Sequence, residues 1–264
     1  KMFFDQKSKV TIRHLITHTS GLPPFKKYFL MDGNIQTKID SIMNTEPEIP
    51  LNQKMIYSDI GLIVLGKIIE SVSQSSLDEY VDSVVFKPLG MKTTFYNPPI
   101  EKIKRIIPTE YSSLYGETII GYVHDENAKS IGGIAGHAGL FSTASDLSIF
   151  SQMMLNGGIY GWKRIFKSQS VTNFTKRANT IEGSSRALGW DTPSGQSSGG
   201  VYLSGSSFGH TGFTGTSLWI DPENQIFVIL LTNAVHPNRN YKNPNYFDWR
   251  QKIHSSVYEE LGFS

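Results

Sequence analysis

Two short stretches of the chain carry residue types that could catalyse one reaction together. Tyr57-Ser58-Asp59 stands at the start of an apolar run over residues 60–69, and His210-Thr211-Gly212 lies far downstream. Tyrosine is a poor base in water, with an unperturbed pKa of about 10. A Tyr at a helix N-terminus near cations can nevertheless be held as the phenolate and can transfer protons. We therefore predict that these two stretches border one active site.

A third stretch has the letters of a nucleophile motif. Gly205-Ser206-Ser207-Phe208-Gly209 fits the G-x-S-x-G pattern, in which the serine must lie between a strand and a helix. Here a further strand is expected after it, and no alternating strand–helix pattern precedes it. We therefore reject Ser207 as a nucleophile.

Two histidines near the start of the chain invite a metal hypothesis. His14 and His18 are four residues apart on an expected helix, without the intervening glutamate of an HExxH motif. A histidine at a helix end more commonly bonds to loop backbone, and we favour that role here.

Apolar periodicity predicts the helices that must position these residues. Thr11 and Ser145 are expected N-caps, Ser76 is expected to open a capping box, and Gly21 suits a C-cap. The expected helices cover residues 11–17, 35–44, 57–73, 76–86, 145–155, 167–177 and 246–261.

The period changes to that of strands in the last quarter of the chain. Strands are expected over residues 199–210, 214–221 and 226–232, the last two joined by a turn. The unbroken apolar run in the last strand indicates a strand covered on both faces. Three strands make a small sheet for a chain of this length, and strands from an upstream segment could extend it. Residues 91–135 are expected to be loops with short strands.

Composition excludes several classes of function. The 264 residues carry a net charge of +2 without a Lys/Arg stripe, so nothing indicates a nucleic-acid partner. The absence of Cys excludes disulfides, thiolate metal sites and a Cys nucleophile, but it leaves the compartment open. No stretch approaches the roughly 20 apolar residues of a membrane span.

The order and separation of the Tyr57 and His210 motifs resemble the serine β-lactamase and penicillin-binding-protein superfamily, in its class C β-lactamase and esterase branch. Residues 17–23 are similar to the segment that follows the nucleophile helix there. Residues 123–128 and 136–142 are similar to a subgroup of N-acetylmuramyl-L-alanine amidases and low-molecular-weight penicillin-binding proteins. The resemblance runs from Lys9 to Leu261.

This resemblance implies an α+β fold, with an antiparallel sheet flanked by helices and a mainly helical subdomain. Residues 1–264 are expected to form a single β-lactamase-like domain. Its mainly helical region would cover residues 1–195 and carry Tyr57. Residues 196–264 would supply the C-terminal strands with His210 and the C-terminal helix. The N-terminal part of the fold would be absent.

The chain departs from the family pattern at three points. No Ser or Thr is followed three residues later by Lys, so the family's Ser-x-x-Lys nucleophile is expected in a segment upstream of Lys1. That missing segment would then be a partner of this chain. Asp59 stands where class C enzymes have Asn, and His210 replaces Lys. Both variants are familiar among esterase-like and amidase-like members, and we interpret them as signals of the substrate.

The resemblance also implies roles for the site residues. Tyr57 would transfer protons during formation and hydrolysis of an acyl-enzyme, with Asp59 and His210 as catalytic neighbours. If a charged His210 anchors a substrate carboxylate, affinity should fall as pH rises through about 6.5. Asp59 could equally be a first-turn acid that complements the helix dipole.

Residues after His210 are expected to bind the substrate. The Phe213 backbone N–H would supply one oxyanion contact, and Gly212 would let the substrate lie close to the strand. Thr211 and Thr214 would contact a substrate carboxylate or amide.

The family requires no metal or other cofactor, so we predict none. His124, Asp125 and His137 could form a metal-binding group, but a structural role in Gly-rich turns is favoured.

The leading hypothesis is a serine hydrolase that cleaves amide or ester bonds, with cell-wall muropeptides as substrates. The alternatives are a promiscuous carboxylesterase or weak β-lactamase, and a non-catalytic module that binds cell-wall peptide. The partner would be a small-molecule or peptide substrate, with no nucleic acid and no membrane span in this chain. An extracytoplasmic location in a bacterium is favoured.

Overall fold

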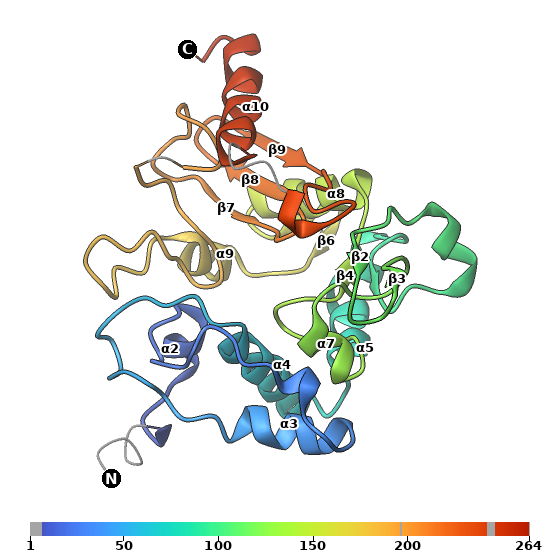
Figure 1. Ribbon diagram of the computed structural model, residues 1–264. Coiled ribbons are helices and arrows are strands. Elements are labelled where there is room, and N and C mark those ends of the chain that lie inside the picture. Colours follow the sequence, from blue (N-terminus) through green and yellow to red (C-terminus); the bar gives the residue numbers. More distant parts are fainter. Residues whose placement is uncertain (1–6, 196, 242–245, 264) are drawn as a thin grey trace.

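A three-stranded antiparallel sheet forms one half of the molecule (Figure 1). The computed structural model describes residues 7–195, 197–241 and 246–263. The strands are β7 (Phe208–Thr211), β8 (Ser217–Asp221) and β9 (Ile226–Leu230), in the order β7-β8-β9. His210 pairs with Leu218, and Trp219 pairs with both Gly209 and Val228. In the described part of the chain, β9 pairs with no strand other than β8.

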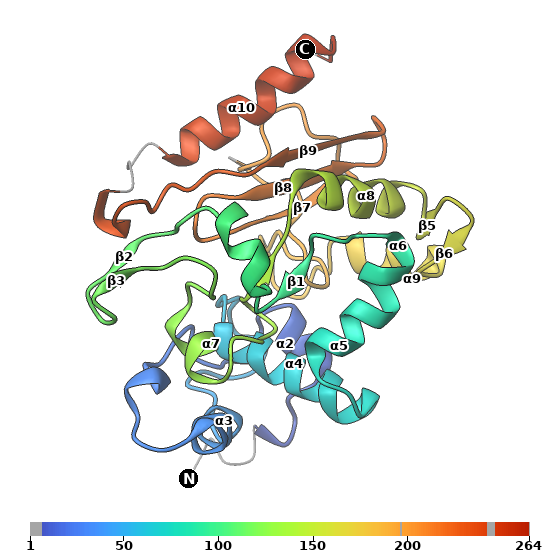
Figure 2. The same ribbon diagram turned by 90° about the vertical axis from the view of Figure 1, so that its right-hand side faces the viewer.

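Alternate side chains of the sheet pack against helices on its two faces. These helices are α8 (Ala144–Leu155) and α10 (Tyr246–Glu260), which lie on opposite sides of the strands in Figure 2. Ile220 and Phe208 pack in one buried cluster with Met153 of α8. On the other face, Ser217 and Asp221 bond to side chains of α10. The prediction of a sheet covered on both faces is therefore confirmed.

A helical region forms the other half of the molecule (Figure 2). Its helices are α2 (Ile12–Ile16), α3 (Ile35–Met43), α4 (Asp59–Ser73) and α7 (Glu126–Ser130). Their apolar faces share a second buried cluster, which includes Leu15, Ile42, Ile60, Ile63 and Ala128. Burial of such side chains stabilises each helix by about 1.5–3 kcal/mol per large residue.

Shorter elements lie between these longer ones along the chain. The helical ones are η1 (Tyr28–Leu30), α5 (Leu77–Val81), the π-helix η2 (Asp82–Phe86), α6 (Lys87–Leu89), η3 (Ile100–Arg105), α9 (Ser168–Thr175) and η4 (Arg239–Tyr241). The strands form two-residue pairs: β1 (Phe95–Tyr96) with β4 (Leu140–Phe141), β2 (Tyr111–Ser112) with β3 (Glu117–Thr118), and β5 (Ile159–Tyr160) with β6 (Lys163–Arg164). The expectation of loops with short strands between residues 91 and 135 is confirmed, but it missed α7.

Four local predictions need correction. The C-cap of α2 is Thr17, so Gly21 does not cap that helix. The Ser76 side chain makes no capping bond, so the expected capping box does not form. The N-cap of α8 is Thr143, whose hydroxyl accepts from the backbone N–H of Asp146, and Ser145 lies inside the helix. The first strand begins at Phe208 instead of residue 199, because residues 197–207 turn, with the Ser204 backbone N–H bonded to the Asp221 carboxylate.

The observed arrangement matches the expected α+β class, with an antiparallel sheet flanked by helices beside a helical region. Within the described residues, no single helix is long and apolar enough to cross a membrane. Only α4 taken together with the segment from α5 to α6 meets those limits, and that pair is bent by 72°.

Candidate active site

The N-terminus of α4 fixes the position of Tyr57. Ser58 is the N-cap, and its hydroxyl accepts from the Gly61 backbone N–H at 3.1 Å. The same buried hydroxyl donates to the Pro23 carbonyl at 2.7 Å. Because Ile60 and Ile63 bury the helix against the core, the residue just before the cap cannot move independently.

A buried histidine supports Tyr57 from one side. The His18 Nδ1 accepts from the Ser58 backbone N–H at 3.1 Å, and its ring centroid lies 4.3 Å from that of Tyr57. Burial, followed by the charges of Arg186 and His210, lowers the pKa of His18 to about 3. His18 is therefore a neutral support for Tyr57. The expectation that it bonds to loop backbone is confirmed.

His14 has a separate structural role. It completes a capping box with Thr11 at the start of α2, and its Nε2 lies 3.0 Å from the Asn52 side-chain amide nitrogen. The two histidines of the early metal hypothesis therefore point to different partners.

The strand β7 brings His210 to Tyr57, with ring centroids 5.9 Å apart. The His210 Nδ1 donates to the Thr211 carbonyl at 2.8 Å, because a carbonyl can only accept. Its Nε2 accepts from the Arg186 Nη1 at 3.0 Å, because a guanidinium can only donate. These two bonds define a neutral imidazole. Burial, and next the Arg186 charge, lower the pKa of His210. This geometry favours a neutral His210, and a carboxylate-binding role for a charged His210 stays a prediction.

Arg186 is the cation of this site, and the sequence reasoning missed it. Its guanidinium carbon lies 5.1 Å from the Tyr57 ring centroid, and its Nε lies 3.3 Å from the Asp191 carboxylate. Asp191 exchanges two backbone hydrogen bonds with Gly209, so this loop is attached to the edge of β7. No motif links Arg186 to His210 in the sequence, because the bridge between their segments is made only in the folded chain.

The surroundings of Tyr57 favour the protonated phenol. Burial is the largest effect and raises the pKa of Tyr57, the Asp59 carboxylate raises it further, and the Arg186 charge opposes both. The groups of the described chain therefore do not hold a phenolate. An additional positive charge near Asp59 or Tyr57 would be needed for that.

The turn after β7 presents the expected substrate-binding residues. The Gly212 N–H donates to the Thr216 carbonyl at 2.8 Å, and a Cβ at Gly212 would collide with the Thr216 hydroxyl. A larger residue at position 212 would therefore force the Thr216 side chain to move. Phe213 is 60% exposed, and the Thr214 carbonyl accepts from Ala234. The substrate-contact and oxyanion roles of Thr211, Gly212, Phe213 and Thr214 remain predictions.

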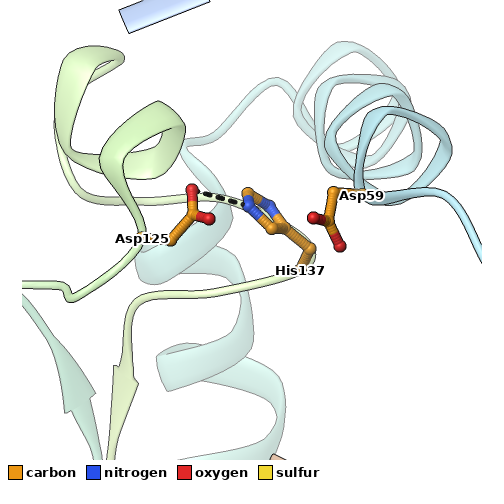
Figure 3. Close-up of side chains that lie close together, drawn as sticks. All are labelled: Asp59, Asp125 and His137. Atoms are coloured by element: carbon orange, nitrogen blue, oxygen red, sulfur yellow. Dashed lines mark hydrogen bonds and ion pairs between the residues drawn. The ribbon is translucent and has the colours of Figure 1, made fainter. Parts of the chain in front are cut away.

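The three residues of the second metal hypothesis separate into two groups. His124 lies 3.1 Å from the Glu110 carboxylate and 3.1 Å from the Arg239 guanidinium. Asp125 and His137 lie together next to Asp59 (Figure 3). The histidines bond to carboxylates, not to the backbone of Gly-rich turns as expected.

Ser207 lies in a setting that does not suit a nucleophile elbow. It is fully buried, its hydroxyl lies 3.2 Å from that of Ser204, and β7 follows it directly. The rejection of this motif is confirmed.

Comparison with known proteins assigns this chain to a family. Residues 2–251 match the family model described as "Beta-lactamase". Relatives in Salmonella gallinarum and Salmonella typhi, named "Putative D-alanyl-D-alanine carboxypeptidase", are 37% identical over 267 residues, which is 91% of this chain. The chain spans 61% of their length.

Solved structures have the same fold at lower identity. A β-lactamase/D-alanine carboxypeptidase from Yersinia pestis matches with a TM-score of 0.66 and 20% identity, over 94% of this chain and 69% of that one. Simvastatin synthase from Aspergillus terreus matches with a TM-score of 0.68 and 17% identity, over 96% and 69%. The predicted β-lactamase/transpeptidase-like fold is confirmed, and the chain belongs to the Beta-lactamase family.

Proposed function

We propose that this protein is a serine hydrolase that forms an acyl-enzyme and removes residues from the carboxyl end of cell-wall peptides. Membership of the Beta-lactamase family and relatives named for D-alanyl-D-alanine carboxypeptidase activity support a hydrolase of this kind. The observation that carries the proposal is the meeting of Tyr57, His210 and Arg186 at the N-terminus of α4.

The nucleophilic serine and its lysine would come from a segment outside residues 1–264. No Ser-x-x-Lys occurs in these residues, and the buried Ser207 does not replace it. The lysine would also add the positive charge that Tyr57 needs to lose its proton. Tyr57 would accept the serine proton as the serine attacks the carbonyl, and would then donate it to the departing amine. Water would hydrolyse the ester by the same path in reverse.

Arg186 would recognise the carboxylate at the end of the substrate. Its side chain is 11% exposed, and a guanidinium binds a carboxylate through paired hydrogen bonds. Its bond to His210 holds the guanidinium beside the strand where the peptide would lie. The neutral His210 would thus position Arg186 instead of binding the carboxylate itself.

The test uses the protein as its host makes it and a muropeptide whose stem ends in D-alanyl-D-alanine. We expect D-alanine to be released, and we expect the same stem with a carboxyl-terminal amide to react at least about tenfold more slowly, since the charged pair is lost. Arg186→Gln should remove this preference for the free carboxylate. Arg164→Gln, at an exposed position in β6, is the matched control.

Two outcomes would overturn the proposal. Hydrolysis of simple acyl esters without release of D-alanine would make the protein a carboxylesterase. Binding of the muropeptide with no turnover of either substrate would make it a binding module.

A further inference from the structure

The exposed ring of Phe213 is contacted by two side chains from distant segments of the chain. Its centroid lies 5.6 Å from that of the His124 ring, and the Arg239 guanidinium carbon lies 5.4 Å from it. The second distance is within the range of a cation–π interaction. Arg239 begins η4, and His124 directly precedes the N-cap of α7. Two segments besides its own strand therefore meet at Phe213.

Glu110 fixes the orientation of Arg239. The buried Glu110 carboxylate accepts from the Arg239 Nε at 2.8 Å and from its backbone N–H at 3.0 Å. The Arg239 Nη2 also donates to the Glu126 carboxylate at 2.8 Å, and the His124 Nε2 lies 3.1 Å from Glu110. Burial would raise the pKa of Glu110, but the bonds from Arg239 and His124 outweigh it and lower that pKa. Several charge-assisted bonds thus hold the guanidinium in one orientation.

The chain that leads into η4 is bonded on both of its sides. On one side the Ala234 N–H donates to the Thr214 carbonyl at 2.7 Å. On the other side the Tyr111 N–H donates to the Pro237 carbonyl at 2.7 Å. This chain therefore connects the turn after β7 with the segment that carries the buried carboxylate.

Phe213 is the only large side chain of that turn. Residues 212–216 have the sequence Gly-Phe-Thr-Gly-Thr, and glycine loses more conformational freedom on folding than any other residue. Contacts that fix the Phe213 ring also restrict its backbone N–H, because both belong to one residue. Arg239 and His124 therefore restrict the turn through the ring.

The same group adjoins the Tyr57 site. His124 contacts Phe213, and the next residue, Asp125, lies close to Asp59 at the start of α4 (Figure 3). Phe213 is also close along the chain to the strand that carries His210. The Phe213 turn thus lies where it could act on a substrate at Tyr57.

We propose that Arg239 is a positioning residue, which holds the Phe213 backbone N–H at the place where the oxyanion forms and acts through the Phe213 ring. This inference rests on the proposed function, because it needs a reaction that forms an oxyanion. A displacement of about 1 Å in a catalytic group can cost about 100-fold in rate. Glu110 would in turn hold Arg239, and His124 would support the ring.

The test is steady-state kinetics on the D-alanyl-D-alanine muropeptide, with the protein as its host makes it. We expect Arg239→Gln to lower kcat by about 10–100-fold and to leave KM within about threefold, since the N–H acts on the transition state. In Phe213→Ala protein the same change should cost less than about threefold more, because the ring through which Arg239 acts is already absent. Arg105→Gln, at an exposed position in η3, is the matched control and should keep full activity.

A second measurement needs no turnover. Amide hydrogen exchange of residues 212–216 should become at least about tenfold faster in Arg239→Gln, while that of α3 should not change. Circular dichroism identifies the folded variants. Arg239→Lys keeps a cation beside the ring, so it should recover part of kcat, and it replaces Arg239→Gln in both measurements if that variant does not fold.

Two results would overturn the positioning role. One is a double variant in which the losses from Arg239→Gln and Phe213→Ala simply multiply, which would mean that the two residues act independently. The other is unchanged exchange of residues 212–216 in a folded Arg239 variant. No turnover by the unaltered protein would instead overturn the proposed function, and hydrogen exchange would still decide whether Arg239 holds Phe213.

Discussion

Tyr57 is held by groups from three segments that lie far apart in the sequence. His18 packs against its ring and bonds to the backbone of the next residue, while His210 and Arg186 approach from the sheet side. Both histidines have lowered pKa values, so Arg186 is the permanent cation of this group. The phenol therefore sits in a fixed position, where only its proton needs to move.

Replacement of Tyr57 by Phe would remove the phenol that we propose transfers protons, and little else. We expect Tyr57→Phe to lower the turnover of peptide or ester substrates by about 10²–10⁴-fold, the usual contribution of a general acid–base residue. The affinity for substrate should change little. Steady-state kinetics on folded protein measures both quantities.

Tyr80→Phe is the matched control, because Tyr80 lies exposed on α5 and should not affect turnover. A Tyr57→Phe variant within threefold of the unaltered protein would exclude Tyr57 from proton transfer.

At the scale of elements, two serines that precede helices differ in whether their side chains cap them. Ser58 and Ser76 both precede a helix in sequence, but only Ser58 caps one with its side chain. Ser58 is also buried and bonded to Pro23, a contact that no local pattern predicts. The strength of a cap is thus decided by the tertiary structure around it.

We expect Ser58→Ala to destabilise the protein by about 1–3 kcal/mol, since it loses the cap and leaves the buried Pro23 carbonyl without a partner. Ser76→Ala should cost less than about 0.5 kcal/mol. Urea unfolding of both variants measures the difference. Equal losses of stability would show that the Ser58 contacts do not stabilise the protein.

Glycine at position 209 lets β7 pack under the Trp219 ring. A Cβ there would collide with that ring and with the Leu218 carbonyl, whereas at Gly205 it would meet nothing within 4 Å. We expect Gly209→Ala to lower the free energy of unfolding by about 1–3 kcal/mol and Gly205→Ala to leave it nearly unchanged. Thermal melting compares the two variants. A Gly209→Ala protein as stable as the control would contradict the packing described here.

Periodicity was sufficient to predict most of the helices and the existence of the three strands, whereas the pairing of Tyr57 with His210 came from their motifs and the family resemblance. It could not identify Arg186 as a site residue, because Arg186 reaches His210 only where the loop of Asp191 pairs with the edge of β7. It could not group Asp59 with His137, since three unrelated segments meet there. The sequence could not give the lowered pKa of His210, because burial and a neighbouring guanidinium cause it and neither is visible in the sequence.

At the scale of the whole molecule, buried neutral histidines make stability depend on pH. His254 lies on α10, its Nε2 is 2.8 Å from the Ser217 hydroxyl, and burial with the nearby Arg250 charge lowers its pKa to about 4. The unfolded chain takes up this proton near pH 6.5, but the folded chain does not until about pH 4. Stability is therefore fully present above pH 6.5 and falls as pH decreases toward 4.

His254→Gln should make this pH dependence weaker. Between its two pKa values, such a histidine lowers the free energy of unfolding by about 1.4 kcal/mol for each pH unit of acidification. The drop in unfolding free energy between pH 6 and pH 5 should therefore be about 1 kcal/mol smaller in the variant. Urea titrations at the two pH values give both drops. Identical drops would mean that His254 is protonated in the folded protein.

The proposed function requires a serine nucleophile that acts on the Tyr57 site from outside residues 1–264. The most direct measurement is fluorophosphonate labelling of the protein as its host makes it, followed by intact mass and peptide mapping. We expect one label, on a serine outside these residues, and no label after denaturation. A label on Ser207 or on any other serine within residues 1–264, or no label on the folded protein, would contradict the proposed function.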